Sequence, residues 1–317
     1  MKERMINRET IEGYVYDHNL ALKTVQNKES ENFGKEFING SIDVQTDEEG
    51  MNVVTVYYTY VTPTTKTGAS NSTYTVLKKI MDEGKTIVTA GKDGALKVKL
   101  SPSLALNDFY TNRNGKEELV SAKRNEGGFA NLVNILTDDL LSRNRFEADM
   151  AINGFKVVEA DEERNITEHG VLKGAIFNFR GAILPVEFTV RSKKGMEYFE
   201  SLDASPTNIV FTKVWGQITS QTLVDRMEEE SAFGEPVVKE YTKTVREYAV
   251  TGANPEPYEF GDEKTLTMED IKKAMADRET YLADVKKRAE EYQAQKAAAP
   301  TATNAASAPA AAGGFNF

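Results

Sequence analysis

The same order of strands, turns and a short helix occurs twice along this chain, and it restricts the fold more than any other feature of the sequence. The first occurrence comprises residues 39–42, 53–61, 74–77, 86–91 and 96–100. The second comprises residues 173–176, 183–190, 198–202 and 209–218, with a turn at 180–181. Each reads as a strand with glycine, a hairpin, a long strand, a short aromatic helix and a closing strand. Many short strands separated by turns favour a barrel or sandwich over a parallel α/β sheet.

Most of the chain up to residue 260 carries the pattern of β-structure. Residues 52–61 are rich in β-branched and aromatic side chains and stop before Pro63, whereas residues 37–44 and 96–100 alternate apolar and polar side chains. Further strands are expected at residues 171–179, 183–190, 209–217 and 237–248. Short helices are expected at residues 74–81, 132–141 and 196–202. The expected fold class is therefore mainly β with some α.

A helical pattern begins at Thr267. Thr267 and Asp270 have the spacing of a capping box, in which each side chain accepts a hydrogen bond from the other residue's backbone N–H. Apolar side chains then recur at alternating spacings of three and four, with one interruption: Met268, Ile271, Met275, Leu282, Val285, Ala289 and Tyr292. This pattern predicts a long helix that either packs back on the preceding unit or self-associates. Residues 297–312 are almost entirely Ala, Pro, Thr, Ser and Asn, a composition that predicts a disordered tail.

The composition excludes several classes of protein. Cysteine is absent, which excludes disulfides, thiol catalysis and cysteine-ligated metal sites. The two histidines, His18 and His169, have no carboxylate pattern around them that indicates a metal. The sequence contains neither a Gly-x-x-x-x-Gly-Lys phosphate loop nor a Gly-x-Ser-x-Gly nucleophile elbow. It also shows no apolar stretch long enough to cross a bilayer and no secretion signal. We expect a cytoplasmic protein that is not an enzyme and has no cofactor, metal or membrane contact.

The charge is unevenly distributed along the chain. The formal net charge is −10. Residues 62–101 nevertheless hold seven lysines against three acids, a local excess of +4, whereas residues 225–247 hold seven acids against four bases. Two interpretations are open at this point. Either acidic loops keep the protein soluble and the lysines are a solvated face, or one groove is positive within an otherwise repelling surface.

The order of elements resembles the OB-fold, a five-stranded Greek-key barrel with a helix between its third and fourth strands, here in tandem. The resemblance implies two OB-like barrels at residues 1–141 and 142–258, a C-terminal helix at 259–296 and a disordered tail at 297–317. Residues 103–110 and 118–124 are similar to single-stranded-DNA-binding proteins of phages and prophages. Phe317 resembles the terminal aromatic residue of bacterial single-stranded-DNA-binding proteins, whose tails are acidic before that residue. Here the neighbouring residues are the neutral Gly313, Gly314 and Asn316.

Single-strand binding requires cations for the phosphates and aromatic faces for the bases. Alternation places Tyr58 and Tyr60 on one face of their strand and Tyr57 on the other, and one of these faces belongs to the barrel core. Lys97 and Lys99 share one face of their strand. The expected nucleic-acid-binding residues are Tyr57, Tyr58, Tyr60, Lys66, Lys78, Lys79, Lys97, Lys99, Tyr110, Arg113, Lys123, Arg124, Phe129, Arg191, Lys193 and Lys194.

These features together indicate sequence-nonspecific binding and protection of single-stranded DNA in phage-type replication or recombination, with RNA as an alternative ligand. Phe315 and Phe317 are expected to recruit replication or recombination proteins, and the C-terminal helix is a candidate for self-association. The location would be the cytoplasm, that of the host if a phage encodes the protein. The competing interpretation is a β-rich structural or adaptor protein, such as a virion component, that binds no nucleic acid. The local lysine excess favours the first interpretation, and the net charge of −10 favours the second.

Overall fold

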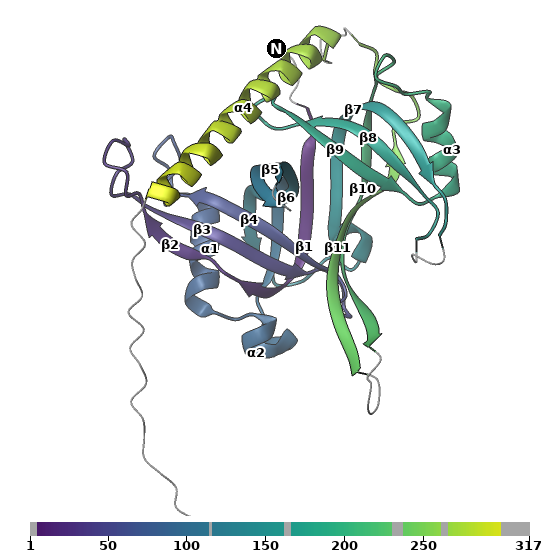
Figure 1. Cartoon of the computed structure of the whole chain (residues 1–317). Helices are drawn as coiled ribbons and strands as arrows, with labels where there is room; N and C mark the ends of the chain where they lie inside the picture. Colours follow the sequence, from purple (N-terminus) through teal and green to yellow (C-terminus); the bar gives the residue numbers. More distant parts are fainter. Residues whose placement is uncertain (1–4, 114–115, 162–165, 230–236, 261–265, 299–317) are drawn as a thin grey trace, which may run out of the picture.

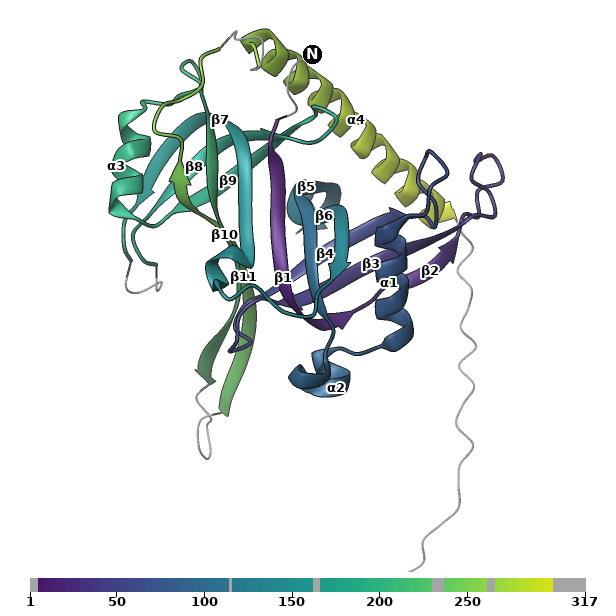
Figure 2. The same cartoon turned by 180° about the vertical axis from the view of Figure 1, so that it is seen from behind.

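The computed structural model describes residues 5–113, 116–161, 166–229, 237–260 and 266–298, and it is mainly β with several helices. Eleven strands in these residues form one continuous sheet. Figures 1 and 2 show two halves built of strands, with a long helix running across them. No helix in the described ranges is long and apolar enough to cross a membrane.

Five strands of the N-terminal half pair in a closed order, and we call this set ring 1. They are β1 (Asn7–His18), β3 (Glu36–Gln45), β4 (Val53–Val61), β5 (Lys97–Arg113) and β6 (Lys116–Leu132). The order of pairing is β1–β3–β4–β6–β5 and back to β1. The β4–β6 pair is parallel and the others are antiparallel. A short strand, β2 (Ala21–Thr24), pairs with β3 and extends the sheet.

Five strands of the C-terminal half repeat this order and form ring 2. They are β7 (Asn144–Val158), β8 (His169–Phe177), β9 (Ile183–Val190), β10 (Val210–Glu229) and β11 (Val237–Ala253). The order of pairing is β7–β8–β9–β11–β10 and back to β7, and β9–β11 is again the parallel pair. The two repeats expected from the sequence therefore correspond to two sets of strands with the same connectivity.

Strand β1 joins the two rings. Its residues 7–11 pair with residues 144–148 of β7, whereas its residues 11–18 pair with β5 and β3 of ring 1. One large core cluster contains side chains from both rings. At its ring 2 side, the aromatic rings of Phe146, Phe188 and Tyr248 pack together with centroids 5.0–5.7 Å apart. The rings are thus held together by backbone pairing and by shared apolar burial.

Two short helices occupy equivalent places, because each follows the third strand of its ring. In ring 1, α1 (Ser72–Glu83) begins at Asn71, whose side chain accepts a hydrogen bond from the Thr73 N–H, and ends at Gly84 with a φ of 59°. In ring 2, α3 (Lys193–Ser201) begins at Ser192, whose hydroxyl accepts from the Gly195 N–H. Both helices agree with the sequence prediction.

Two other expectations are wrong. The helix expected at residues 132–141 does not form, because β6 continues to Leu132 and only a short 3-10 turn, Leu140–Ser142, follows. Residues 86–91, expected to close the first repeat, instead begin helix α2 (Ile87–Gly94). The reason is local, since Thr86 and Thr89 form a capping box that satisfies the first backbone N–H groups of the helix.

The long C-terminal helix α4 (Met268–Ala298) begins at the expected capping box, where Thr267 and Asp270 exchange hydrogen bonds. Ile271 and Ala274 are buried in a small second core with residues of ring 2. The helix therefore packs back on ring 2, and it runs on toward ring 1 in Figure 1. Several of the expected apolar positions remain outside this contact, since Met275 is 50% and Tyr292 64% exposed.

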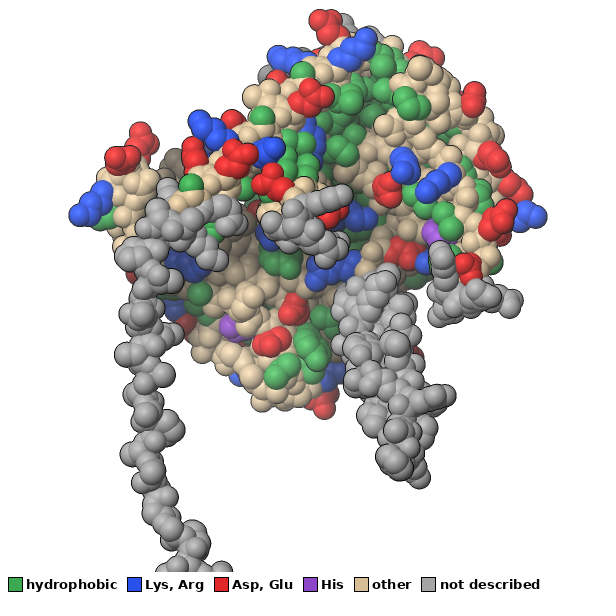
Figure 3. All heavy atoms as spheres, in the orientation of Figure 1, with side chains coloured by type: hydrophobic (Ala, Val, Ile, Leu, Met, Phe, Trp, Pro, Cys, Tyr) green, Lys and Arg blue, Asp and Glu red, His purple; other side chains and the backbone are tan. Residues whose placement is uncertain are grey.

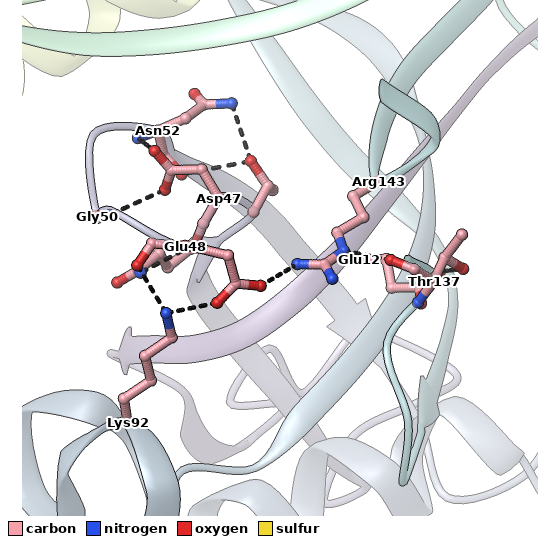
Figure 4. A network of polar contacts seen from close by, with 10 residues as sticks. Glu12, Asp47, Glu48, Gly50, Asn52, Lys92, Thr137 and Arg143 are labelled. Carbon is pink, nitrogen blue, oxygen red and sulfur yellow. Dashed lines mark hydrogen bonds and ion pairs between the residues drawn. The ribbon is translucent and has the colours of Figure 1, made fainter. Parts of the chain in front are cut away.

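A polar network fixes the segment 133–143 that connects the rings (Figure 4). The Glu12 carboxylate on β1 accepts from the Thr137 N–H at 2.6 Å and pairs with Lys99 at 2.9 Å. Arg143 donates to the Thr137 carbonyl at 2.6 Å and to Glu48 at 2.8 Å. Burial alone would raise the pKa of Glu12, but the hydrogen bonds from Lys99 and Thr137 together hold it below its ordinary value. The connecting segment is consequently anchored to ring 1 by buried, charge-assisted bonds.

A buried carboxyl group lies where β1 joins the rings. Glu9 is 2% exposed and pairs in register with Phe146 of β7. Burial raises the pKa of Glu9 to about 8, and neither of its carboxylate oxygens has a hydrogen-bond partner among the described residues. Tyr248 donates to Asn125 of β6, whose side chain donates to the Thr55 carbonyl of β4 at 2.7 Å. Polar contacts therefore run from the junction to β4.

Replacing Arg143 by Met should lower the free energy of unfolding by about 2–3 kcal/mol, because two charge-assisted bonds are lost from a side chain that is 7% exposed. Urea denaturation measures this change. Arg145→Met is the matched control, since its side chain is 47% exposed, and it should change stability by less than about 0.5 kcal/mol. Equal effects of the two changes would contradict an anchoring role for the network.

Glu9→Gln should remove a pH dependence from stability. The carboxyl ionises near 4.5 in the unfolded chain and near 8 in the folded one, so the folded protein holds the extra proton. The wild type should therefore lose stability as pH rises from 4.5 through 8, by at most about 1.4 kcal/mol per pH unit. Urea denaturation at pH 5, 6, 7 and 8, with the exposed Glu197→Gln as control, measures this slope. Parallel curves for wild type and Glu9→Gln would refute it.

Candidate nucleic-acid interface

The side chains of residues 54–58 of β4 alternate between the core and the outer surface of ring 1. Val54, Val56 and Tyr58 are buried, with Tyr58 only 1% exposed. Thr55 and Tyr57 point to the opposite, outer side, as strand alternation requires. The expected stacking role of Tyr58 does not agree with this burial, because its ring is enclosed by the core. Tyr57 is the member of the pair that faces outward.

A guanidinium group from the neighbouring strand lies over the Tyr57 ring. The Arg124 guanidinium carbon is 4.8 Å from the ring centroid. The parallel β4–β6 pair places the two residues together, since Val56 pairs with Asn125 and Tyr57 with Glu126. A cation over a tyrosine face contributes about 0.5–1 kcal/mol at an exposed site, and here the Tyr57 side chain is half-buried.

An open hollow of about 390 Å³ surrounds this pair on the outer side of ring 1. Two of its lining residues, Lys23 and Arg124, are cations, and none is Asp or Glu. Lys23 on β2 donates to the Asn39 side chain on β3 at 3.0 Å. The complete lining is Asn19, Ala21, Lys23, Asn39, Gly40, Ser41, Tyr57, Tyr58, Thr59 and Arg124. In a chain of net charge −10, this lining combines an aromatic side chain with two cations, and the nearest acid, Glu126, accepts from the Thr59 hydroxyl at its edge at 3.1 Å.

Further aromatic and basic groups continue along the same strands. Phe37 and Tyr60 lie with centroids 4.7 Å apart toward one end of β3 and β4, and Tyr60 is 45% exposed. Toward the other end, Arg246 of β11 donates to the Thr55 hydroxyl at 3.3 Å. Ring 2 thus adds a cation to the outer face of β4, where the Thr55 hydroxyl also donates to Asp43 at 2.7 Å. Figure 3 shows Lys and Arg side chains interspersed with Asp and Glu side chains near the recess between the two halves.

The structure places Lys123 at the junction of the rings and not in this hollow. Its amine lies 5.2 Å from the Tyr248 ring centroid and donates to the Glu187 carbonyl at 3.0 Å. Burial lowers the pKa of Lys123, although Glu187 and Glu247 act in the opposite direction. A lysine in this position supports the contact between hairpin β5–β6 and ring 2.

Lys97 and Lys99 lie on another side of ring 1. They are on β5, which pairs with β1 and β6, so β6 on one side and β1 and β3 on the other separate them from β4. Lys97 lies 5.5 Å from the Tyr14 ring centroid, and Lys99 forms its ion pair with the buried Glu12. The expected cluster of these lysines around residue 57 is therefore wrong, because strand order around the ring is not chain order.

The other expected residues are scattered, and acids compensate several of them. Lys78 and Lys79 on α1 pair with Asp82 and Glu83 one helical turn on. Arg191 forms a bidentate pair with Glu247, with both distances under 2.9 Å. The rest lie apart from the hollow: Lys66 in the loop after β4, Tyr110 on β5, Phe129 on β6, and Lys193 and Lys194 at the start of α3. The side chain of Arg113 and the tail residues Phe315 and Phe317 lie outside the described residues.

Sequence reasoning missed Lys23, Asn39 and Arg246. Lys23 lies on a strand of four residues, too short for an alternating pattern. Arg246 lies inside the stretch 225–247, where acids outnumber bases. A count of charges over that stretch therefore does not single out one arginine. Within the described ranges, no group of three or more His, Asp or Glu residues could hold a metal ion.

This chain is similar to two solved structures of a single-stranded DNA binding protein. The arrangement is similar to that of the wild-type single-stranded DNA binding protein from Thermus aquaticus, with a TM-score of 0.46, 10% identity, and coverage of 83% of this chain and 98% of that one. A deletion mutant of the same protein gives a TM-score of 0.45, 9% identity, and coverage of 82% and 99%. Likeness at this level carries no functional conclusion.

No protein with a curated description matches the sequence. A family model described as YorF matches residues 6–288, which include both rings and most of α4, and the chain belongs to the YorF family.

Proposed function

We propose that the protein binds single-stranded DNA along the outer face of β3 and β4, with a base stacked on Tyr57. The observation that carries this proposal is the Tyr57–Arg124 pair in a hollow with two cations and no carboxylate. Stacking of a base on an aromatic side chain is worth about 1–3 kcal/mol, and cations attract the phosphates. Both contacts would use side chains on the outer side of ring 1, where the Arg124 guanidinium lies over one face of the Tyr57 ring.

We interpret each ring as an OB-fold barrel. Each has five strands with a parallel pair between the third and fifth, and a helix between the third and fourth. In this interpretation β3 and β4 are the second and third barrel strands of ring 1, and OB-folds bind oligonucleotides on that face. The ring pairings lie within residues 7–132 and 144–253, in keeping with the proposed domains 1–141 and 142–258.

The chemistry of the hollow favours single strands and little sequence preference. Bases in a duplex are stacked on one another, so an unpaired base is needed to cover the Tyr57 ring. Every base has a flat face, and a guanidinium attracts any phosphate, so neither contact distinguishes one base from another. RNA satisfies the same contacts, and oligo-U measured beside oligo-dT separates the two ligands.

One group of observations favours the competing role of a structural or adaptor protein. Acids pair with Lys78, Lys79, Lys99 and Arg191, so much of the local positive charge is compensated. If that role is correct, the Tyr57 hollow will bind no nucleic acid at low salt.

The wider role is part of the same proposal. Nonspecific single-strand binding suits the protection of DNA during phage-type replication or recombination in a cytoplasm. Self-association through α4 remains a proposal, and its exposed residues Met275, Tyr281 and Tyr292 would supply the contact. Recruitment of partner proteins by Phe315 and Phe317 is likewise proposed.

Fluorescence anisotropy with labelled oligo-dT and its duplex tests the binding. The single strand should bind more tightly, and its affinity should fall as salt rises, because bound phosphates release counterions. Tyr57→Ala should weaken binding about 5- to 100-fold with little change in salt slope, while Tyr57→Phe retains the affinity. Arg124→Gln should weaken binding and flatten the slope.

Lys97→Gln is the matched control, because Lys97 lies on another side of the same ring. It should leave affinity and salt slope close to wild type. Equal weak binding to single strand and duplex would contradict the proposal, as would a Tyr57→Ala variant that binds like wild type.

Deletion of residues 313–317 tests the proposed tail. The melting temperature and the affinity for oligo-dT should stay unchanged, because the proposed binding face lies on ring 1. Recovery of a replication or recombination protein on immobilised full-length chain should fall, and Phe315→Ala with Phe317→Ala should reproduce this loss. Unchanged recovery would leave the tail as a spacer.

A further inference from the structure

Helix α3 and the end of β11 enclose an open hollow of about 550 Å³ on ring 2. In ring 1 the equivalent helix, α1, packs on β6, where the Ala130 N–H donates to the Thr73 hydroxyl at 3.4 Å. Helix α3 packs instead on β7 and β8, and the centroid of its Phe199 ring lies 6.0 Å from that of Phe155 on β7. The place that α1 fills in ring 1 therefore remains partly open in ring 2, beside residues 250–255.

The lining of this hollow is positively charged. Its charged members are Lys193 and Lys194, so it holds two cations and no carboxylate. Both lysines are exposed, the first turn of α3 contains no acid, and neither lysine forms an ion pair within the described ranges. The acids closest in sequence, Glu197 of α3 and Glu256 after β11, are not lining residues. Two uncompensated ammonium groups at one hollow attract phosphate oxygens.

The rest of the lining is mainly apolar and includes an aromatic side chain that is held in place. Tyr198 lies one helical turn after Lys194, so both project from the same side of α3. The hydroxyl of the half-buried Tyr198 donates to the Asn254 carbonyl at 2.7 Å, which fixes the ring between α3 and the segment after β11. The volume falls in the range of small-molecule sites, so the hollow accommodates an organic group beside a phosphate.

Strand β11 leads from this hollow to the proposed site on ring 1. Gly252 and Ala253 of β11 line the hollow, and Arg246 of the same strand donates to Thr55 of β4. Six residues of a strand span about 20 Å. At about 3.4 Å per nucleotide of one DNA strand, this distance corresponds to about six nucleotides. A single strand that lies on Tyr57 therefore needs only a short continuation to reach the two lysines.

We propose that this hollow is the ring 2 contact for the same single strand, with Lys193 and Lys194 on its phosphates and one nucleoside against Tyr198. The inference rests on the proposed function and extends it from one contact to two, one on each ring. Continuity along β11 favours a nucleic-acid strand over a separate acidic peptide. Because the two contacts lie apart, the second adds affinity for long strands and none for strands that cover the Tyr57 hollow alone.

Anisotropy with oligo-dT of about 5 and about 35 nucleotides tests this, since one OB-fold accommodates roughly 4–16 nucleotides. Replacing Lys193 and Lys194 together by Gln should leave binding of the shorter strand unchanged. For the longer strand it should lower the salt slope by about 1.4, because each phosphate contact to a single strand contributes about 0.7. The affinity gap between wild type and variant should then widen about four- to five-fold as salt falls from about 0.3 to about 0.1 M.

The aromatic contact has its own variant. Tyr198→Leu keeps an apolar side chain in the hollow and removes the stacking face. It should weaken binding of the longer strand at least about five-fold, the loss of one stacked base, and leave the shorter strand unchanged.

Lys272→Gln combined with Lys273→Gln is the matched control, because these lysines are also adjacent, exposed and helical, on α4, which does not line the hollow. It should change neither salt slope. An unchanged long-strand slope without Lys193 and Lys194, while Tyr57→Ala still weakens the short strand, would overturn this inference alone. Equal losses for both strand lengths would also contradict it. Absence of binding to either strand by the wild type would instead overturn the proposed function.

Discussion

The pairing of strand β1 with both rings is the constraint on which the rest of the structure depends. Its first residues complete the edge of β7, and its later residues close ring 1 between β3 and β5. Because one strand serves both rings, their relative position is set by backbone hydrogen bonds and not by a flexible connection. That position brings Arg246 of ring 2 to β4 and lets hairpin β5–β6 reach α4.

The segments predicted correctly are those in which local pattern and tertiary environment agree. The segment Val53–Val61, which forms β4, is rich in β-branched and aromatic residues. The alternation of its side chains therefore predicts the strand. Strands β1 and β7 were not recognised, because they place Glu9, Glu12 and Asp149 in buried positions. Glu12 and Asp149 are supported by partners distant in the sequence, Lys99 and Ile6, and a local stretch of sequence does not reveal such partners. Glu9 has no hydrogen-bond partner among the described residues, and its burial comes from the fold alone.

The candidate site was predicted in part for the same reason. Tyr57 and Arg124 were both expected, yet their contact follows from the parallel β4–β6 pair, which joins residues about seventy positions apart. Lys97 was expected beside them because it follows soon after in the chain, but strand order carries it to another side of ring 1. Local charge counts describe a surface only where neighbours in sequence are also neighbours in space.

The acidic composition is compatible with a local site for phosphates. At physiological ionic strength, charges more than about 8 Å apart are largely screened, so the cations that line the hollow act on a ligand more strongly than the distant acids do. Several acids elsewhere on ring 1 form ion pairs with the lysines beside them. Net charge then governs the long-range approach of a nucleic acid, while the lining governs the bound state.

The buried carboxyl of Glu9 has a consequence for calorimetry. Between pH 4.5 and about 8 the folded protein holds a proton at this group that the unfolded chain has released. Thermal unfolding in this range therefore delivers a proton to the buffer. The measured enthalpy of unfolding will include the buffer's heat of protonation, and it will differ between phosphate and Tris at the same pH. The size of that difference gives the net number of protons released on unfolding, to which Glu9 contributes.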